Sequence, residues 1–140
     1  MNIIKSKLLL GALVSLFSIS SFANVAVIVN SNNSAVIDES DLSRIFLGKI
    51  KSFSTDEKIT LVNLEYNHAT RDEFEEKVLN KSASQVKAYW SKLMFSGKGK
   101  PPKEFSSDKD ILAFVAGTPG AIGYVDESSV DASVKVIKVF

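Results

Sequence analysis

A short run of apolar, mostly β-branched residues, Val25–Val29, constrains the fold more than any other feature of the sequence. Its residues do not alternate with polar ones, so the pattern predicts a strand that is buried on both faces. The polar segment 30–34 then ends the strand in a turn. Because a strand covered on both faces needs layers on both sides of its sheet, we expect an α/β architecture.

Further apolar runs and helical patterns follow along the chain. Strands are predicted at 59–64, 121–125 and 134–140, where apolar residues lie between turn signals. Helical patterns follow four candidate N-caps: Ser40, Thr70, Ser82 and Ser107. The order of one strand, one helix, one strand, three helices and two strands predicts a mixed sheet flanked by helices.

Two of these helix starts have the spacing of a capping box, Thr70 with Glu73 and Ser82 with Gln85. The second box precedes an apolar stripe with helical spacing, which makes it the clearest helix in the chain. The helix is expected to end at Ser96-Gly97, and the loop 98–102 contains one glycine and two prolines and cannot continue it.

Charge and composition exclude several classes of function. The formal net charge is +1, which is too balanced for the clustered positive field that nucleic-acid binding needs. The chain has no Cys and a single His, His68, so thiol nucleophiles and Cys-type zinc sites are excluded. It also lacks the usual nucleotide-binding and nucleophile motifs, so we expect no cofactor and no metal, and an enzyme is the weakest hypothesis.

Residues 1–23 are predicted to be a secretory signal peptide. Lys5 and Lys7 form a basic start, an apolar stretch follows, and Ala23 provides the small residue for cleavage. The apolar stretch is shorter than the ~20 residues that span a bilayer, so a membrane anchor is disfavoured. We therefore expect residues 24–140 to be exported to a bacterial periplasm as one domain, without membrane insertion.

The segment 67–74 is the best candidate for a binding site. It follows a predicted buried strand and brings the hydroxyl of Thr70, the guanidinium of Arg71 and free backbone amides to the start of a helix. Such a position attracts anions. The structural alternative is that Thr70 only caps the helix and that Arg71 is an exposed side chain near Asp72 and Glu75.

Four blocks of sequence together resemble a known family. They are Leu42–Lys49, Thr70–Phe74, Ala88–Gly99 and Pro119–Val125. They resemble the substrate-binding proteins of phosphate ABC transporters, in particular the short periplasmic phosphate-binding-like proteins of Gram-negative bacteria. The resemblance implies a periplasmic-binding-protein type 2-like lobe, about half the length of a two-lobe transport receptor.

The resemblance also implies where a ligand would bind. In the full-length family phosphate lies between two lobes, held by a Gly/Ser-rich loop of the first and an S-G-T-R-like segment of the second. Thr70 and Arg71 match the end of that segment, whereas His68 and Ala69 replace its serine and glycine. The Gly/Ser-rich loop of the first lobe has no counterpart in this sequence, and the segment most similar to it is 30–34.

The first hypothesis is a non-enzymatic periplasmic receptor for phosphate or a similar oxyanion, with an ABC permease as a candidate partner. Thr70 and Arg71 would bind the anion. The backbone amides of Asp72 and Glu73 would assist, and His68 would add a donor when it is protonated.

The second hypothesis is a protein-interaction module. A single lobe that has lost solute binding would dock on another envelope protein through the surface that the missing lobe would cover. The shortened chain favours this hypothesis. Lys98 and Lys100 would be outer residues of an anion site under the first hypothesis, and otherwise belong to a solvated cationic loop.

Overall fold

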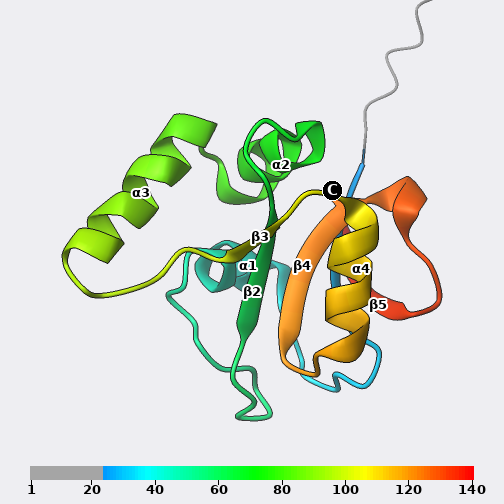
Figure 1. Ribbon diagram of the computed structural model, residues 1–140. Coiled ribbons are helices and arrows are strands. Elements are labelled where there is room, and N and C mark those ends of the chain that lie inside the picture. Colours follow the sequence, from blue (N-terminus) through cyan, green and yellow to red (C-terminus); the bar gives the residue numbers. More distant parts are fainter. Residues whose placement is uncertain (1–23) are drawn as a thin grey trace, which may run out of the picture.

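The sheet of the computed structural model, which describes residues 24–140, carries helices on both of its faces (Figure 1). The predicted signal peptide, residues 1–23, lies outside the described residues. None of the helices described has both the length and the apolar character needed to cross a membrane. The architecture is the mixed α/β arrangement expected from the sequence.

Five strands form one mixed sheet in the order β3-β2-β4-β1-β5. Their bounds are β1 Val25–Asn30, β2 Thr60–Leu64, β3 Lys103–Phe105, β4 Ala121–Asp126 and β5 Val134–Val139. Strand β2 runs parallel to both β3 and β4, whereas β1 is antiparallel to β4 and β5. Every residue of β1 is buried, which confirms the strand covered on both faces.

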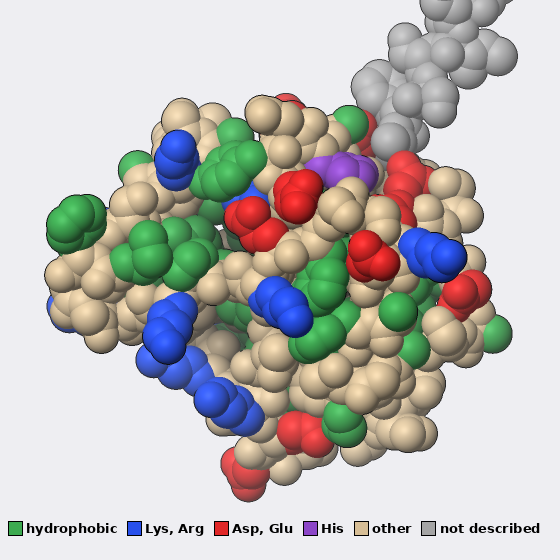
Figure 2. Space-filling model, in the orientation of Figure 1, with side chains coloured by type: hydrophobic (Ala, Val, Ile, Leu, Met, Phe, Trp, Pro, Cys, Tyr) green, Lys and Arg blue, Asp and Glu red, His purple; other side chains and the backbone are tan. Residues whose placement is uncertain are grey.

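The helices connect these strands. Their bounds are α1 Glu39–Phe46, α2 Ala69–Phe74, α3 Ala83–Phe95 and α4 Asp108–Gly117. Helix α2 continues into a π-helical turn, η1 (Glu75–Leu79), and a 3₁₀ turn, η2 (Glu127–Ser129), follows β4. Helix α3 extends to one side of the sheet in Figure 1, and Figure 2 shows hydrophobic side chains at that edge of the molecule.

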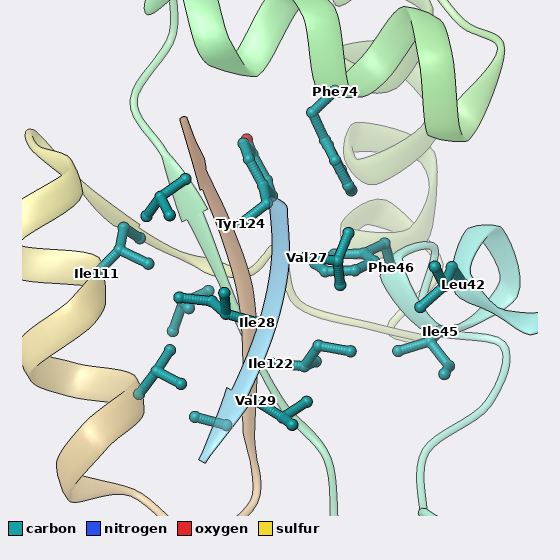
Figure 3. Close-up of a cluster of buried hydrophobic side chains, with 14 of the residues drawn as sticks. Val27, Ile28, Val29, Leu42, Ile45, Phe46, Phe74, Ile111, Ile122 and Tyr124 are labelled. Atoms are coloured by element: carbon teal, nitrogen blue, oxygen red, sulfur yellow. The ribbon is translucent and has the colours of Figure 1, made fainter. Parts of the chain in front are cut away.

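Two apolar layers hold the helices against the sheet (Figure 3). Ile111 of α4 lies on one side of the strands, and the side chains of α1 and α2 lie on the other. The rings of Phe74 and Tyr124 stack with centroids 3.8 Å apart, and Phe46 meets Phe74 edge to face at 4.7 Å. These rings tie α1 and α2 to β4, so the packing fixes the position of the segment that the sequence singled out.

Two predicted helix starts are confirmed. Ser82 and Gln85 form the expected capping box, and the Ser107 side chain accepts a hydrogen bond from the Asp110 amide. Helix α1 is followed by Gly48 with a φ of +71°, a left-handed conformation that favours glycine.

Three predictions were wrong. Helix α1 begins before Ser40, with Asp38 as the N-cap and no side-chain cap hydrogen bond. Thr70 does not cap α2, because the N-cap is His68, whose Nδ1 accepts from the Thr70 amide at 3.3 Å. The third is the predicted order of elements, because strand β3, for which no strand was predicted, lies between α3 and α4 and pairs in parallel with β2 at the sheet edge.

Candidate functional site

Arg71 is a buried cation just beyond the carboxyl end of β2. Its side chain is 2% exposed. Nε donates to Glu75 Oε1 at 2.6 Å, while Nη1 donates to the Leu64 carbonyl at 2.8 Å and to Glu104 Oε1 at 2.9 Å. The ring of Tyr66 covers the guanidinium, with its centroid 4.0 Å from Cζ. Three hydrogen bonds from Nε and Nη1 hold the guanidinium in one orientation, and Nη2 donates to no carboxylate or carbonyl of the described residues.

Burial and charge oppose each other in this cluster. Burial raises the pKa of Glu75 despite the attraction of Arg71, and Glu75 Oε2 is buried without a hydrogen-bond partner. Burial also acts to lower the pKa of Arg71, but its hydrogen bonds with Glu75 and Glu104 outweigh that effect and leave the pKa raised. Arg71 therefore stays charged throughout the pH range in which the protein would function.

A pocket of about 180 Å³ lies beside this cluster, and we call it the Arg71 pocket. Its polar lining consists of Asn63, Tyr66, Arg71, Lys87, Ser91 and Glu104. Trp90, Met94 and two prolines provide the apolar part. About six water molecules occupy this volume in liquid water. The pocket can therefore hold one small ion together with some of its hydrating water molecules.

The position of the Arg71 pocket follows from the topology of the sheet. Asn63 lies near the end of β2, Glu104 lies on the parallel neighbour β3, and Arg71 lies in the first turn of the helix that follows β2. In open α/β sheets, ligands bind outside the carboxyl ends of parallel strands. The Arg71 pocket occupies such a position.

The pocket combines hydrogen-bond donors with one carboxylate. The amide oxygen of Asn63 accepts from the buried Tyr124 hydroxyl, so the Nδ2 group of Asn63 is the part that can donate to a ligand. Lys87 brings an ammonium group 5.6 Å from the Tyr66 ring centroid, and the half-exposed Glu104 offers a carboxylate. The pocket can therefore bind an anion that also carries a proton to donate.

Of the five residues predicted to bind the anion, Arg71 lines this pocket and the other four do not, and the predicted outer residues Lys98 and Lys100 do not line it either. Thr70 is buried inside α2, and His68 caps that helix. The Asp72 amide donates to the His68 carbonyl at 3.2 Å, and the Glu73 carboxylate pairs with a lysine of the next helical turn. The structural alternative for Arg71 was also wrong in part, because this side chain is buried and pairs with Glu75.

Sequence reasoning missed most of the pocket. Asn63 is a polar residue within a predicted buried strand, and this unusual position could have marked it as a candidate site residue. Glu75 follows Arg71 by four residues, which is the spacing of a helical ion pair. Lys87 and Glu104 had no such signal, because the tertiary fold brings them to Arg71. No group of three or more His, Asp or Glu side chains within residues 24–140 could hold a metal ion.

Comparisons with solved structures show the same fold. A phosphate ABC transport receptor from Vibrio cholerae aligns with a TM-score of 0.64 and 24% identity, over 83% of this chain and 46% of that protein. A Clostridium perfringens protein described as a phosphate ABC transporter substrate-binding protein with bound phosphate aligns with a TM-score of 0.65 and 26% identity, over 83% and 45%. PstS from Borrelia burgdorferi aligns with a TM-score of 0.61 and 17% identity, over 82% and 47%.

This chain thus spans less than half the length of these structural neighbours. None of the curated proteins matches it. A family model described as a PBP superfamily domain matches residues 22–137, which is most of the chain. The resemblance noted in the sequence is confirmed, and the chain belongs to the PBP superfamily domain family.

Proposed function

We propose that this chain is a non-enzymatic solute-binding lobe for a small oxyanion, with phosphate as the first candidate. The observation that carries the proposal is the buried Arg71 guanidinium, which lines a small pocket and has Nη2 free of carboxylates and carbonyls. The Clostridium perfringens neighbour with bound phosphate supports the same ligand class. Export by the predicted signal peptide and contact with an ABC permease belong to this proposal.

Phosphate suits the Arg71 pocket better than sulfate does. Arg71, Lys87 and Asn63 can all donate hydrogen bonds to anionic oxygens. Glu104 can only accept when it is ionised, and phosphate retains a proton at neutral pH that it can donate to this carboxylate. Sulfate has no such proton, so its oxygens would meet the Glu104 carboxylate as like charges.

Thr70, His68, Asp72 and Glu73 do not contribute to the proposed contacts, because none of them lines the pocket. Binding at a pocket with one wall leaves the anion partly solvated, and solvent screens its attraction to Arg71. We therefore expect weaker binding than in a two-lobe receptor that encloses its ligand.

The second candidate function is a protein-interaction module, and the exposed end of α3 favours it. Phe95 is 94% exposed and Met94 is 50% exposed, and Met94 also lines the Arg71 pocket. An apolar pair beside an open pocket is suited to contact another protein domain. A partner that covers α3 would also provide the missing second wall.

Thermal unfolding with phosphate, sulfate or chloride at constant ionic strength tests the first candidate. Phosphate at ~100 times its dissociation constant would add about 2.7 kcal/mol to the stability, a shift of several degrees in the melting temperature. We expect a clear shift with phosphate, a smaller one with sulfate and none with chloride.

The matched variants are Lys87→Gln and Lys92→Gln, both on exposed positions of α3. Lys87 lines the Arg71 pocket and Lys92 does not. We expect Lys87→Gln to weaken phosphate binding about tenfold, since a hydrogen bond to a charged group contributes ~1.5 kcal/mol, and Lys92→Gln to have no effect. Arg71→Ala is unsuitable as the first variant, because it leaves Glu75 buried without its partner, at a cost of ~3–5 kcal/mol.

No shift with any of the three anions would contradict solute binding and favour the interaction module. Equal shifts with phosphate and sulfate would contradict the role of Glu104. A loss of binding in Lys92→Gln that matches the loss in Lys87→Gln would place the anion outside the Arg71 pocket.

A further inference from the structure

A second hollow lies on the other side of Trp90, at the amino end of β2. Its volume is about 330 Å³, and we call it the lysine hollow. Its rim carries four lysines: Lys51, Lys58, Lys98 and Lys100. Its apolar floor includes Ile59, Leu61, Trp90 and Leu93. Figure 2 shows Lys and Arg side chains beside a recess below α3.

Two separate loops approach Trp90 and form this hollow, and Gly48 is needed for the closer approach. A Cβ atom on Gly48 would lie 3.1 Å from Cη2 of Trp90, which is tighter than ordinary contact, and the φ of Gly48 is +71°. A Cβ atom on Gly99 would lie 3.8 Å from Cζ3 of the same ring. The loop after α1 and the loop after α3 therefore both pack on one indole.

The charge of the lysine hollow is uncompensated. Lys51 and Lys58 belong to the segment between α1 and β2, whereas Lys98 and Lys100 follow α3. None of the four ammonium groups makes an ion pair or a hydrogen bond with a residue in the described range 24–140, and no acidic side chain is among the lining residues. In a chain of formal net charge +1, this is a local concentration of positive charge that attracts anions.

We infer that the lysine hollow binds a small amphipathic anion. An aromatic or alkyl body would lie on Trp90 and Leu93, and a carboxylate, sulfonate or phosphate group would face the lysines. The volume falls within the range of ~300–1,000 Å³ that is typical of small-molecule sites, and such sites combine an apolar lining with a few polar groups. An inorganic anion would leave the apolar floor unfilled.

The inference does not depend on the proposed function, because the two pockets have different charged residues. The Arg71 pocket has a buried guanidinium beside carboxylates, whereas the lysine hollow has exposed ammonium groups around an apolar floor. Trp90 lines both and is the only tryptophan of the chain. Its fluorescence therefore reports on either pocket without a label.

The test uses two dyes with the same aromatic body, 1-anilinonaphthalene-8-sulfonate and the neutral N-phenyl-1-naphthylamine. We expect the sulfonate to bind the full-length protein with a stoichiometry of one and to quench Trp90 by energy transfer. In the double variant Lys58→Gln/Lys100→Gln its affinity should fall about tenfold, since each exposed charge contributes up to ~1 kcal/mol. Binding of the neutral dye should not change.

The matched control is Lys92→Gln/Lys109→Gln, which removes two exposed lysines that line neither pocket. This variant and Lys87→Gln should bind the sulfonate with unchanged affinity, and phosphate should not displace it. Thermal melts of each variant check that the fold is intact. If the proposed function is wrong, phosphate will not bind, but the effects of these variants on dye binding will be unchanged.

Two outcomes would overturn the inference. One is equal affinity for the charged and neutral dyes, and the other is unchanged sulfonate binding in Lys58→Gln/Lys100→Gln. If this double variant also loses binding to vesicles of phosphatidylglycerol, the second outcome would assign the lysines to a membrane surface.

Discussion

The position of Arg71 in the chain was predictable from a sequence motif, but the residues that surround it in the fold were not. Its place at a helix start after a buried strand was predicted from the sequence. Glu75 follows Arg71 by four residues, and that spacing indicates a helical ion pair. Glu104, in contrast, reaches Arg71 only because β3 pairs with β2. The sequence therefore predicted the cation of the candidate site, while the surrounding carboxylates and the ring of Tyr66 depend on tertiary structure.

The raised pKa of Glu75 predicts a pH dependence of stability. A carboxyl whose folded pKa lies above its unfolded value contributes stability below the unfolded value, 4.5, and that contribution is lost as pH rises through the folded pKa. The free energy of unfolding of the wild type, measured relative to Glu75→Gln, should therefore fall as the pH rises above 4.5. Urea titrations at several pH values measure it. A relative stability that increases with pH would contradict the effect of burial on Glu75.

At the scale of elements, long apolar runs and strong caps were predictable, and short edge elements were not. Strands β1, β2, β4 and β5 and the capping box of α3 were all expected. Strand β3 has only three residues, of which Lys103 and Glu104 are exposed, so no periodicity marks it. Its pairing with β2 decides its conformation. The same limit applies to Thr70, because His68 was a less obvious N-cap than a threonine.

Ser82→Ala should destabilise the protein by ~1 kcal/mol, because the Ser82 side chain accepts from the Gln85 amide at the start of α3. The control is Ser40→Ala. Ser40 is exposed inside α1 and makes no cap hydrogen bond, so this change should stay within ~0.5 kcal/mol of the wild type. Urea denaturation measures both. An equal loss in the two variants would contradict the assigned helix starts.

For the whole molecule, the topology places two different pockets on the two sides of Trp90. The Arg71 pocket lies near the carboxyl end of β2 and beside β3, and the lysine hollow lies at the amino end of β2. The fold class and the family were predictable because buried runs and the four sequence blocks extend over most of the chain. The two pockets were not predictable from the sequence, because each is formed by segments that come together only in the folded protein.

The central claim is that this lobe binds phosphate in the Arg71 pocket. The most direct measurement is a ¹H–¹⁵N NMR titration of the full-length protein with phosphate and, separately, with sulfate at the same ionic strength. We predict saturable shifts of the Arg71 Nε–H and Trp90 indole signals, larger with phosphate than with sulfate, and no change at Lys58 or Lys100. Shifts confined to the lysine hollow, or none at Arg71 with phosphate, would contradict the claim.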